Sequence, residues 1–456
     1  MEFLEKILRK ITPSREEYLT MGKVASKVLT AAYSVLNELQ IDAKPEIHGS
    51  YSKDTWLSGE GDIDLFILFP SNIPLSKMRE QGLYVAERVA EKLKCCAKHR
   101  YASHPYLELY INDVKVDIVP GYYVRTYEEV KTPVDRTRLH TIYVLHNLKK
   151  EQRGHVRLLK KFFKALGLYG AEIKVQGFSG YLIELLIIKY GTFINALKSI
   201  AEWKPYKVSI SLEEAVQPGK FNEPLVFIDP VDPRRNVAAA VSEENLWKAI
   251  AAAQAFIENP SECFFNVEHA DREEVFELLK NRETFLLALV YHFNRYLPED
   301  VVWGQLKRAE RKLKNFLERK GFKIFSTASW YENARAAVFL EASTPTLPPV
   351  FERKGPPINA QGVKLFLAKY SKTGAVAGPY IKEGKWHVLL KRKKRDLTEI
   401  LEENMDKIGV PQELLKAYKG IRLGENLAEL FESQEYVDFL YYWLRRKEPW
   451  LECVEN

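Results

Sequence analysis

The chain has 456 residues, of which 46% are apolar and 28% charged, and its net charge is +7 at pH 7. One hydrophobic core rarely serves so long a chain, so the length suggests about two to four domains. No apolar run reaches the roughly eighteen residues that a transmembrane helix needs, and residues 1–11 form a charged amphipathic helical pattern rather than the apolar core of a signal peptide.

Cysteine usage indicates the compartment. The four cysteines, Cys95, Cys96, Cys263 and Cys453, show no Cys-x-x-Cys spacing, and a vicinal pair cannot readily form an unstrained disulfide. We therefore expect a reducing, cytoplasmic compartment and no structural zinc. The modest positive charge is consistent with a partner that carries phosphates.

The first predicted elements alternate between helix and strand. Ser14 caps a predicted helix over residues 15–40. After a short β-like run, Gly49-Ser50 opens a helical turn, where free backbone N–H groups and a hydroxyl could receive a phosphate. The elements that follow are an apolar strand over 65–69 that ends at Pro70, a helix over 75–94, and a hairpin of strands 106–111 and 114–119 around Asn112-Asp113.

Three acidic residues lie on these strands. Asp62 and Asp64 stand two apart at the head of the apolar strand, and residues i and i+2 of a strand project from one face. Asp117 alternates with Val116 and Ile118, so it joins the other two if the strands are neighbours. Carboxylates in a poorly solvated cleft repel one another unless cations share them, and carboxylates with substrate phosphates are the usual environment of Mg²⁺. We therefore predict a metal-dependent nucleotidyl-transfer site.

Beyond residue 136 the pattern is mostly helical up to Pro260. It includes helices over 155–166, 179–189 and 242–256, and an apolar strand from Leu225 that ends in two Asp-Pro steps and the pair Arg234-Arg235. Asn259-Pro260 marks a break in the pattern. The elements beyond it are a helix over 272–280, a strand over 285–293, a helix over 299–320 and strands near 322–327 and 336–340, in the order of a split β-α-β-β unit.

The C-terminal part carries weaker signals. Residues 344–357 hold five prolines and predict a connecting loop, a helix is predicted over 359–370, and closing helices extend to about residue 447. The basic run 391–395 either tracks a phosphate backbone beside Trp386 or Tyr380, or is a solvated strand end. No His-Glu-x-x-His, Gly-x-x-x-x-Gly-Lys or Gly-x-Ser-x-Gly occurs, which removes the common zinc-protease, P-loop and serine-hydrolase motifs.

Taken together, the motifs resemble a known family. Gly49-Ser50, Asp62-Ile63-Asp64 and Val116-Asp117-Ile118 resemble the palm of the polymerase-β-like nucleotidyltransferases. The finer pattern is similar to the archaeal, class I CCA-adding tRNA nucleotidyltransferases. It includes Val134-Asp135-Arg136-Thr137 with His140, Arg157-Leu158-Leu159-Lys160, Gly167-Leu168-Tyr169-Gly170, Gly177-Phe178-Ser179-Gly180, and Asp229-Pro230-Val231-Asp232 followed by Arg235-Asn236-Val237.

The resemblance implies roles for individual residues. Asp62, Asp64 and Asp117 would hold two Mg²⁺ ions, and Asp117 would help the tRNA 3′-hydroxyl attack the α-phosphate of CTP or ATP. The residues implied to contact the nucleotide are Gly49, Ser50, Lys53, Lys160 and Tyr169 at the triphosphate, Thr137 and His140 near the sugar and phosphates, and Arg235 at the base edge, with Arg234 as a second candidate.

The predicted fold is α+β and multidomain. It has a polymerase-β-like nucleotidyltransferase palm (residues 1–136), a mostly helical central domain that completes the nucleotide site (137–258) and an α+β C-terminal region that binds tRNA (259–456). The resemblance implies template-independent addition and repair of the 3′-terminal CCA of tRNA, a grip on the acceptor stem and TΨC arm, no DNA template, and a homodimer. The alternatives are a poly(A) or oligoadenylate polymerase with the same palm, and a catalytically silent RNA-binding protein.

Overall fold

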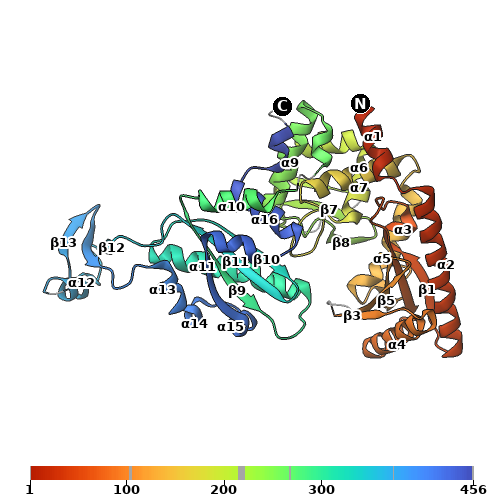
Figure 1. The fold of residues 1–456 in the computed structure, drawn as a ribbon, viewed down its shortest axis with the longest axis horizontal. Coiled ribbons are helices and arrows are strands. Elements are labelled where there is room, and N and C mark those ends of the chain that lie inside the picture. Colours follow the sequence, from red (N-terminus) through yellow and green to blue (C-terminus); the bar gives the residue numbers. More distant parts are fainter. Residues whose placement is uncertain (1, 102–104, 214–220, 267–268, 373, 454–456) are drawn as a thin grey trace. The chain divides into compact units, whose positions relative to one another are not determined.

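The chain forms two compact units (Figure 1). The computed structural model describes residues 2–101, 105–213, 221–266, 269–372 and 374–453. Unit 1 consists of Met1–Glu268, Pro298–Asp300 and Lys447–Asn456, and unit 2 of His269–Leu297 and Val301–Arg446. The chain therefore divides into two compact units, and the predicted division into palm, central domain and C-terminal region stays a prediction.

The N-terminal part of unit 1 is the predicted palm, a five-stranded mixed sheet. Its strands, in sheet order, are β1 (Lys44–His48), β2 (Asp62–Phe69), β5 (Val114–Tyr122), β4 (Pro105–Ile111) and β3 (Ala97–Tyr101). The central strands β2 and β5 are parallel, and helices α2 (Arg15–Glu38) and α4 (Leu75–Leu93) contact each other and the sheet. The predicted hairpin is confirmed, because Asn112 and Asp113 both adopt the left-handed conformation that a tight turn requires.

The cap of α2 also fixes the loop that leads to the acidic strand. The Ser14 hydroxyl accepts a hydrogen bond from the Glu17 N–H, and the Glu17 carboxylate accepts one from the Ser14 N–H. The same carboxylate accepts hydrogen bonds from the Gly59 N–H at 2.7 Å and from the Ser58 hydroxyl. One glutamate thereby holds the start of a helix and the approach to Asp62.

The rest of unit 1 is mostly helical, as predicted. The predicted N-terminal helix began at Met1, which lies outside the described residues. Its helices are α1 (Glu2–Ile11), α5 (Arg136–Asn147), α6 (Gln152–Ala165), α7 (Gly180–Tyr190), α8 (Phe193–Ala201) and α9 (Glu243–Glu258). They enclose a core rich in fully buried phenylalanines, namely Phe162, Phe163, Phe178, Phe193, Phe256, Phe264 and Phe265. This core is separate from the palm core, so unit 1 has two centres of packing.

A small three-stranded sheet joins this helical part. It contains β6 (Val208–Ile210), β7 (Leu225–Asp229) and β8 (Asp232–Asn236). The fully buried β7 was predicted, whereas β8 was not, because its proline and two arginines give no apolar alternation. Among the described helices, none is by itself long and apolar enough to cross a bilayer; only α7 and α8 together meet that test, and they are bent by 96° at their junction.

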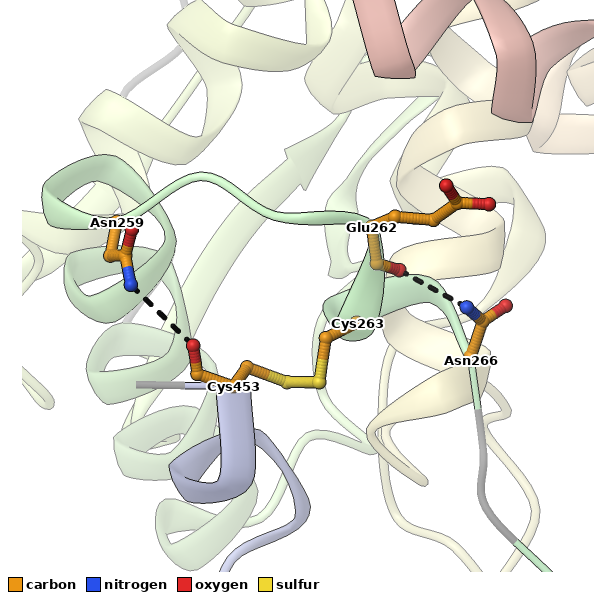
Figure 2. Close-up of a disulfide and its surroundings, with 5 residues drawn as sticks. All are labelled: Asn259, Glu262, Cys263, Asn266 and Cys453. Atoms are coloured by element: carbon orange, nitrogen blue, oxygen red, sulfur yellow. Dashed lines mark hydrogen bonds between the residues drawn. A yellow bond between two sulfur atoms is a disulfide. The ribbon is translucent and has the colours of Figure 1, made fainter. Parts of the chain in front are cut away.

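A disulfide joins two distant segments of unit 1. Cys263, in the short helix η3 (Glu262–Phe265), pairs with Cys453, in η5 (Pro449–Cys453), 190 residues later in the chain (Figure 2). The Asn259 side-chain amide donates to the Cys453 carbonyl oxygen at 3.5 Å, and Trp450 is buried in the same phenylalanine-rich core. The expectation of a reducing compartment did not include this pairing, which sequence spacing cannot reveal.

Unit 2 is built on a four-stranded antiparallel sheet with helices on both faces. Its strands, in sheet order, are β10 (Ile324–Glu332), β11 (Arg335–Ala342), β9 (Phe285–His292) and β15 (Tyr418–Leu423). Leu287 and Leu289 of β9 pack in the core with α11 (Glu299–Lys320), and Leu286 and Ala288 pack in the core with α10 (Arg272–Lys280) and α16 (Gln434–Arg445). The predicted β-α-β-β order is confirmed. Strand β15 was missed within the predicted closing helices, of which α13 (Leu397–Glu402), α14 (Met405–Ile408) and α15 (Gln412–Ala417) precede it.

The proline-rich stretch 344–357 is not wholly a loop, and that prediction was wrong in its second half. It contains β12 (Val350–Pro357), an edge strand of the sheet β12-β14-β13, with β13 (Ala377–Lys382) and β14 (Lys385–Lys391). An edge strand tolerates proline because one of its sides needs no ladder hydrogen bonds. Helix α12 (Val363–Tyr370) begins four residues later than predicted.

Most side chains of the basic run 391–395 that have contacts make them within unit 2. Arg392 donates to the Lys320 carbonyl oxygen at 2.9 Å, and Arg395 donates to the Leu347 carbonyl oxygen at 2.7 Å. Lys394 pairs with Glu399 and Glu403. These contacts favour the interpretation of the run as a solvated strand end over that of a continuous phosphate track.

Candidate active site

The parallel pair of central strands brings the three predicted carboxylates together. Asp64 on β2 is directly opposite Asp117 on β5, and Asp62 lies two residues earlier on the same face. The intervening Ile63 is fully buried, so the strand alternates between core and site as predicted. Gly49, at the start of α3 (Gly49–Lys53), has φ +73°, and a Cβ there would lie 1.8 Å from Asp64 Oδ2. Only glycine permits this approach.

The electrostatics of this cluster are strained by like charges. Burial, together with the charges of Asp62 and Asp117, raises the pKa of Asp64 to about 7. Burial also raises the pKa of Asp117, and Asp62 adds to this effect while the Lys115 ammonium opposes it. Lys115 Nζ lies 2.7 Å from Asp117 Oδ2. Lys115 and Lys53 are the positive charges that oppose the rise in the pKa of Asp64.

The carboxylates fit a divalent cation by their chemistry. Among the described residues, no three acidic, histidine or cysteine side chains are already arranged as a formed metal site. Lys115 holds one oxygen of Asp117. The other, Asp117 Oδ1, is buried and has no hydrogen-bond partner among the described groups. A hard cation with oxygen ligands would meet both needs, since it supplies positive charge and fills the open coordination of Asp117.

A cavity of about 360 Å³ lies next to the acidic strand. The predicted residues that line it are Ser50, Lys53, Asp62, Asp64, Lys160 and Tyr169. Three further polar residues that the sequence analysis did not single out also line it, namely Glu60, Lys164 and Glu184. The cavity is therefore acidic on the side of β2 and cationic on the side of α6.

Two buried lysines form the cationic side. Lys53 Nζ lies 2.6 Å from Glu184 Oε2, and Lys160 Nζ donates to the Thr55 carbonyl oxygen at 2.9 Å. Burial lowers the pKa of Lys160 to about 8, and the Lys53 charge lowers it further while Glu184 opposes the shift. Both ammonium groups are placed to meet a polyphosphate.

We expect the affinity for a nucleoside triphosphate to fall as pH rises above about 8. Lys160 carries its charge below its pKa of about 8 and loses it above that value, so the KM for the triphosphate should rise by up to about tenfold for each further pH unit. The measurement is KM against pH between about pH 7 and about pH 9.5. In Lys160→Met this dependence should disappear; a profile that persists in that variant would contradict the assignment.

A second cavity, of about 520 Å³, contains the predicted base-contacting arginines. Arg235 Nη1 lies 2.9 Å from Asp229 Oδ2, and His140 Nε2 lies 3.0 Å from the same oxygen. The His140 ring stacks on Tyr181 with centroids 3.9 Å apart, and the Tyr181 hydroxyl donates to Asp229 Oδ1 at 3.2 Å. The fully buried Asp229 thus fixes both Arg235 and His140.

Arg234 has a different environment. Its Nε lies 3.0 Å from Asp232 Oδ1, its guanidinium lies over the Tyr127 ring at 4.7 Å, and its side chain is 66% exposed. Arg235 is only 37% exposed and is held by Asp229. The more fixed of the two is therefore Arg235.

The structure does not bring every predicted residue to a cavity. Thr137 lies on α5, three residues before His140, where its carbonyl oxygen accepts a hydrogen bond from Thr141 at 2.9 Å. Neither cavity is lined by Thr137 or His140, and neither is lined by Gly49 or Asp117.

Glu184 was missed, although it is a lone charge in an apolar run, which is a costly position without a function or a partner. Asp229 was noted only as part of a family motif, and its role as the partner of Arg235 and His140 was missed.

Comparisons with known proteins identify the same family along most of the chain. Three family models match it: a nucleotidyltransferase domain at residues 33–144, the second domain of tRNA nucleotidyltransferase at 154–266, and the C-terminal domain of CCA-adding enzyme at 282–418. A CCA-adding enzyme from Pyrobaculum islandicum is 36% identical, over 89% of this chain and 95% of its own length. One from Sulfurisphaera tokodaii is 34% identical, over 89% and 92%, and one from Thermococcus gammatolerans is 33% identical, over 98% of both.

Proposed function

The chain belongs to the CCA-adding enzymes, tRNA nucleotidyltransferases that complete the 3′-CCA end, and we propose that unit 1 performs this reaction in the 360 Å³ cavity with CTP and ATP as substrates. The observation that carries the proposal is the convergence of Asp62 and Asp64 with Lys53 and Lys160 on one cavity. Acids on one side and ammonium groups on the other match a metal-bound triphosphate, whose phosphates need both.

Each residue then has a role in the transfer. Asp62, Asp64 and Asp117 would hold two Mg²⁺ ions, which supply activation of the attacking hydroxyl and stabilisation of the leaving pyrophosphate. The N–H groups at Gly49-Ser50 and the ammonium groups of Lys53 and Lys160 would bind the triphosphate, with Tyr169 beside them. Thr137 and His140 would lie near the sugar and phosphates. Asp117 would hold a cation through Oδ1, the oxygen that Lys115 leaves without a partner.

The test is an extension assay with defined acceptors. The protein is incubated with Mg²⁺ and CTP, ATP or both, and with tRNA that ends before CCA, before C-A or before the final A, and the product ends are sequenced. Addition that stops at CCA supports the proposal. A long A tail would instead support a poly(A) or oligoadenylate polymerase, and tight tRNA binding without incorporation would indicate a silent palm.

Replacing Arg235 should weaken the binding of both CTP and ATP, whereas replacing Arg234 should not. Arg235 offers planar donors to the base edge of C or A, and lysine lacks that fork. We expect Arg235→Lys to raise the KM for CTP and ATP by roughly 10- to 100-fold, the range for hydrogen bonds to a charged group. Arg234→Lys is the matched control. Equal KM values in the two variants would contradict the assignment of Arg235.

The remaining assignments concern the partner and the assembly. Unit 2 would bind the acceptor stem and TΨC arm through their shape and backbone, as A-form RNA requires. We also propose a homodimer, which light scattering after size-exclusion chromatography can test, and a cytoplasmic location. That location and the Cys263–Cys453 disulfide are compatible in cells that maintain intracellular disulfides, as hyperthermophiles do.

A further inference from the structure

Helix α7 carries a single acidic residue in an apolar environment. Glu184 is fully buried, and so are its neighbours Ile183 and Leu185. A buried carboxylate is costly unless it is paired and hydrogen-bonded. The position therefore requires partners that hold the charge.

Those partners come from the cationic side of the active-site cavity. Glu184 Oε2 accepts a hydrogen bond from Lys53 Nζ and Glu184 Oε1 accepts one from Thr55 Oγ1, both at 2.6 Å. Lys160 Nζ lies 4.0 Å from Glu184 Oε1. Thr55 links Lys160 to Glu184, because Lys160 Nζ donates to the Thr55 carbonyl oxygen at 2.9 Å and to its hydroxyl oxygen at 3.3 Å. Although burial raises the pKa of Glu184, the two ammonium groups and the Thr55 hydroxyl hold it below its ordinary value.

We propose that Glu184 is a positioning residue that organises Lys53 and Lys160 for the triphosphate before the nucleotide binds. This inference rests on the proposed function of the cavity. Two lysine side chains close together repel each other, and each loses rotamer freedom when it is fixed on a ligand. A carboxylate between them offsets the repulsion and fixes both lysine side chains before the triphosphate binds. Less side-chain entropy is then lost on binding, so the affinity is higher.

Glu184 itself is placed to act through the lysines. Although Glu184 lines the cavity, its side chain has almost no exposed surface, and its two carboxylate oxygens are occupied by Lys53 and Thr55. The cluster of two ammonium groups and one carboxylate keeps a net positive charge opposite Asp62 and Asp64. A purely structural role would instead be limited to joining α7 to α3 and α6, and would affect stability alone.

The experiment compares Glu184→Gln with a matched buried glutamate. Glu310 in unit 2 is also buried, lies 3.4 Å from the Lys307 ammonium and accepts from two hydroxyls, those of Ser329 and Thr327. For Glu184→Gln we expect a KM for CTP and for ATP that is roughly 10- to 100-fold higher, with kcat and the KM for tRNA nearly unchanged. Glu310→Gln should lose thermal stability but keep the wild-type KM for CTP.

Two further variants keep the test decisive. Thr55→Val removes the hydroxyl that links Lys160 to Glu184, and should raise the KM for CTP less than Glu184→Gln does; Thr55→Ser keeps the hydroxyl and should behave as wild type. An unchanged KM in Glu184→Gln, a similar rise in Glu310→Gln, or an equal loss in kcat would overturn the inference. If Glu184→Gln does not fold, an unchanged KM in Thr55→Val overturns it.

Equilibrium binding separates this inference from the proposed function. Calorimetry with CTP and Mg²⁺ needs no turnover. The CTP affinities of wild type and Glu184→Gln can therefore be compared even if neither protein adds nucleotides to tRNA. Wild-type binding without CCA addition would refute the proposed function alone. Equal CTP affinities in the two proteins, with CCA addition intact, would refute the role of Glu184 alone.

Discussion

Replacing Asp117 by alanine is expected to abolish nucleotide transfer while leaving tRNA affinity nearly unchanged. Asp117 is the acid on β5 opposite Asp64, and one of its oxygens is buried without a hydrogen-bond partner. Loss of a shared cation ligand removes several kcal/mol of transition-state stabilisation, which corresponds to roughly a 10³-fold fall in kcat. The measurements are single-turnover extension of tRNA lacking CCA, and filter binding of the same tRNA.

The same hairpin offers a matched control. Asp113 is an exposed turn residue with φ +64°, a conformation that asparagine also tolerates. Asp113→Asn and Asp117→Asn therefore make the same chemical change in one hairpin, and only the second should lose activity. Normal activity in Asp117→Asn or Asp117→Ala would show that the metal assignment is wrong.

Reducing the Cys263–Cys453 disulfide is expected to destabilise the protein substantially. The bond spans 190 residues of chain, and cross-links that close long loops restrict the unfolded chain most. The expected loss is about 2–5 kcal/mol in the free energy of unfolding. It can be measured as a lower melting temperature by scanning calorimetry with and without a phosphine reductant.

Serine variants identify the bond responsible. Cys453→Ser should melt at the lower temperature whether or not reductant is present, and Cys96→Ser, which changes an exposed free cysteine, should behave as wild type in both conditions. A wild-type melting temperature that does not respond to complete reduction would contradict the prediction. Transfer activity at room temperature should be similar in all these proteins, because the cysteines line neither of the two site cavities.

The placement of the acidic residues was largely predictable because it depends on local spacing. The i, i+2 spacing of Asp62 and Asp64 places both on one face of any strand, and the Asn112-Asp113 turn identified the hairpin that carries Asp117. The parallel pairing of β2 with β5, by contrast, is a long-range contact, and the sequence supported it only through the family resemblance.

What escaped prediction depends on partners that are distant in sequence. Lys53 and Lys160, the partners of Glu184, lie 131 and 24 residues before it in the chain, and nothing local indicates that they meet. Asp229 fixes Arg235 and His140 only once β7, β8 and α5 are assembled. Strand β12 was missed because prolines suggested a loop, although an edge strand accepts them.

The return of the chain to unit 1 has a consequence for biosynthesis. Trp450 and Cys453 belong to the phenylalanine-rich core of unit 1, yet the ribosome makes them after the whole of unit 2. Domains tend to fold as they emerge, N-terminal first, but here the core of unit 1 stays incomplete until residues 447–453 appear. Unit 2 can therefore finish folding before unit 1 does, so the order of completion is the reverse of the order of synthesis.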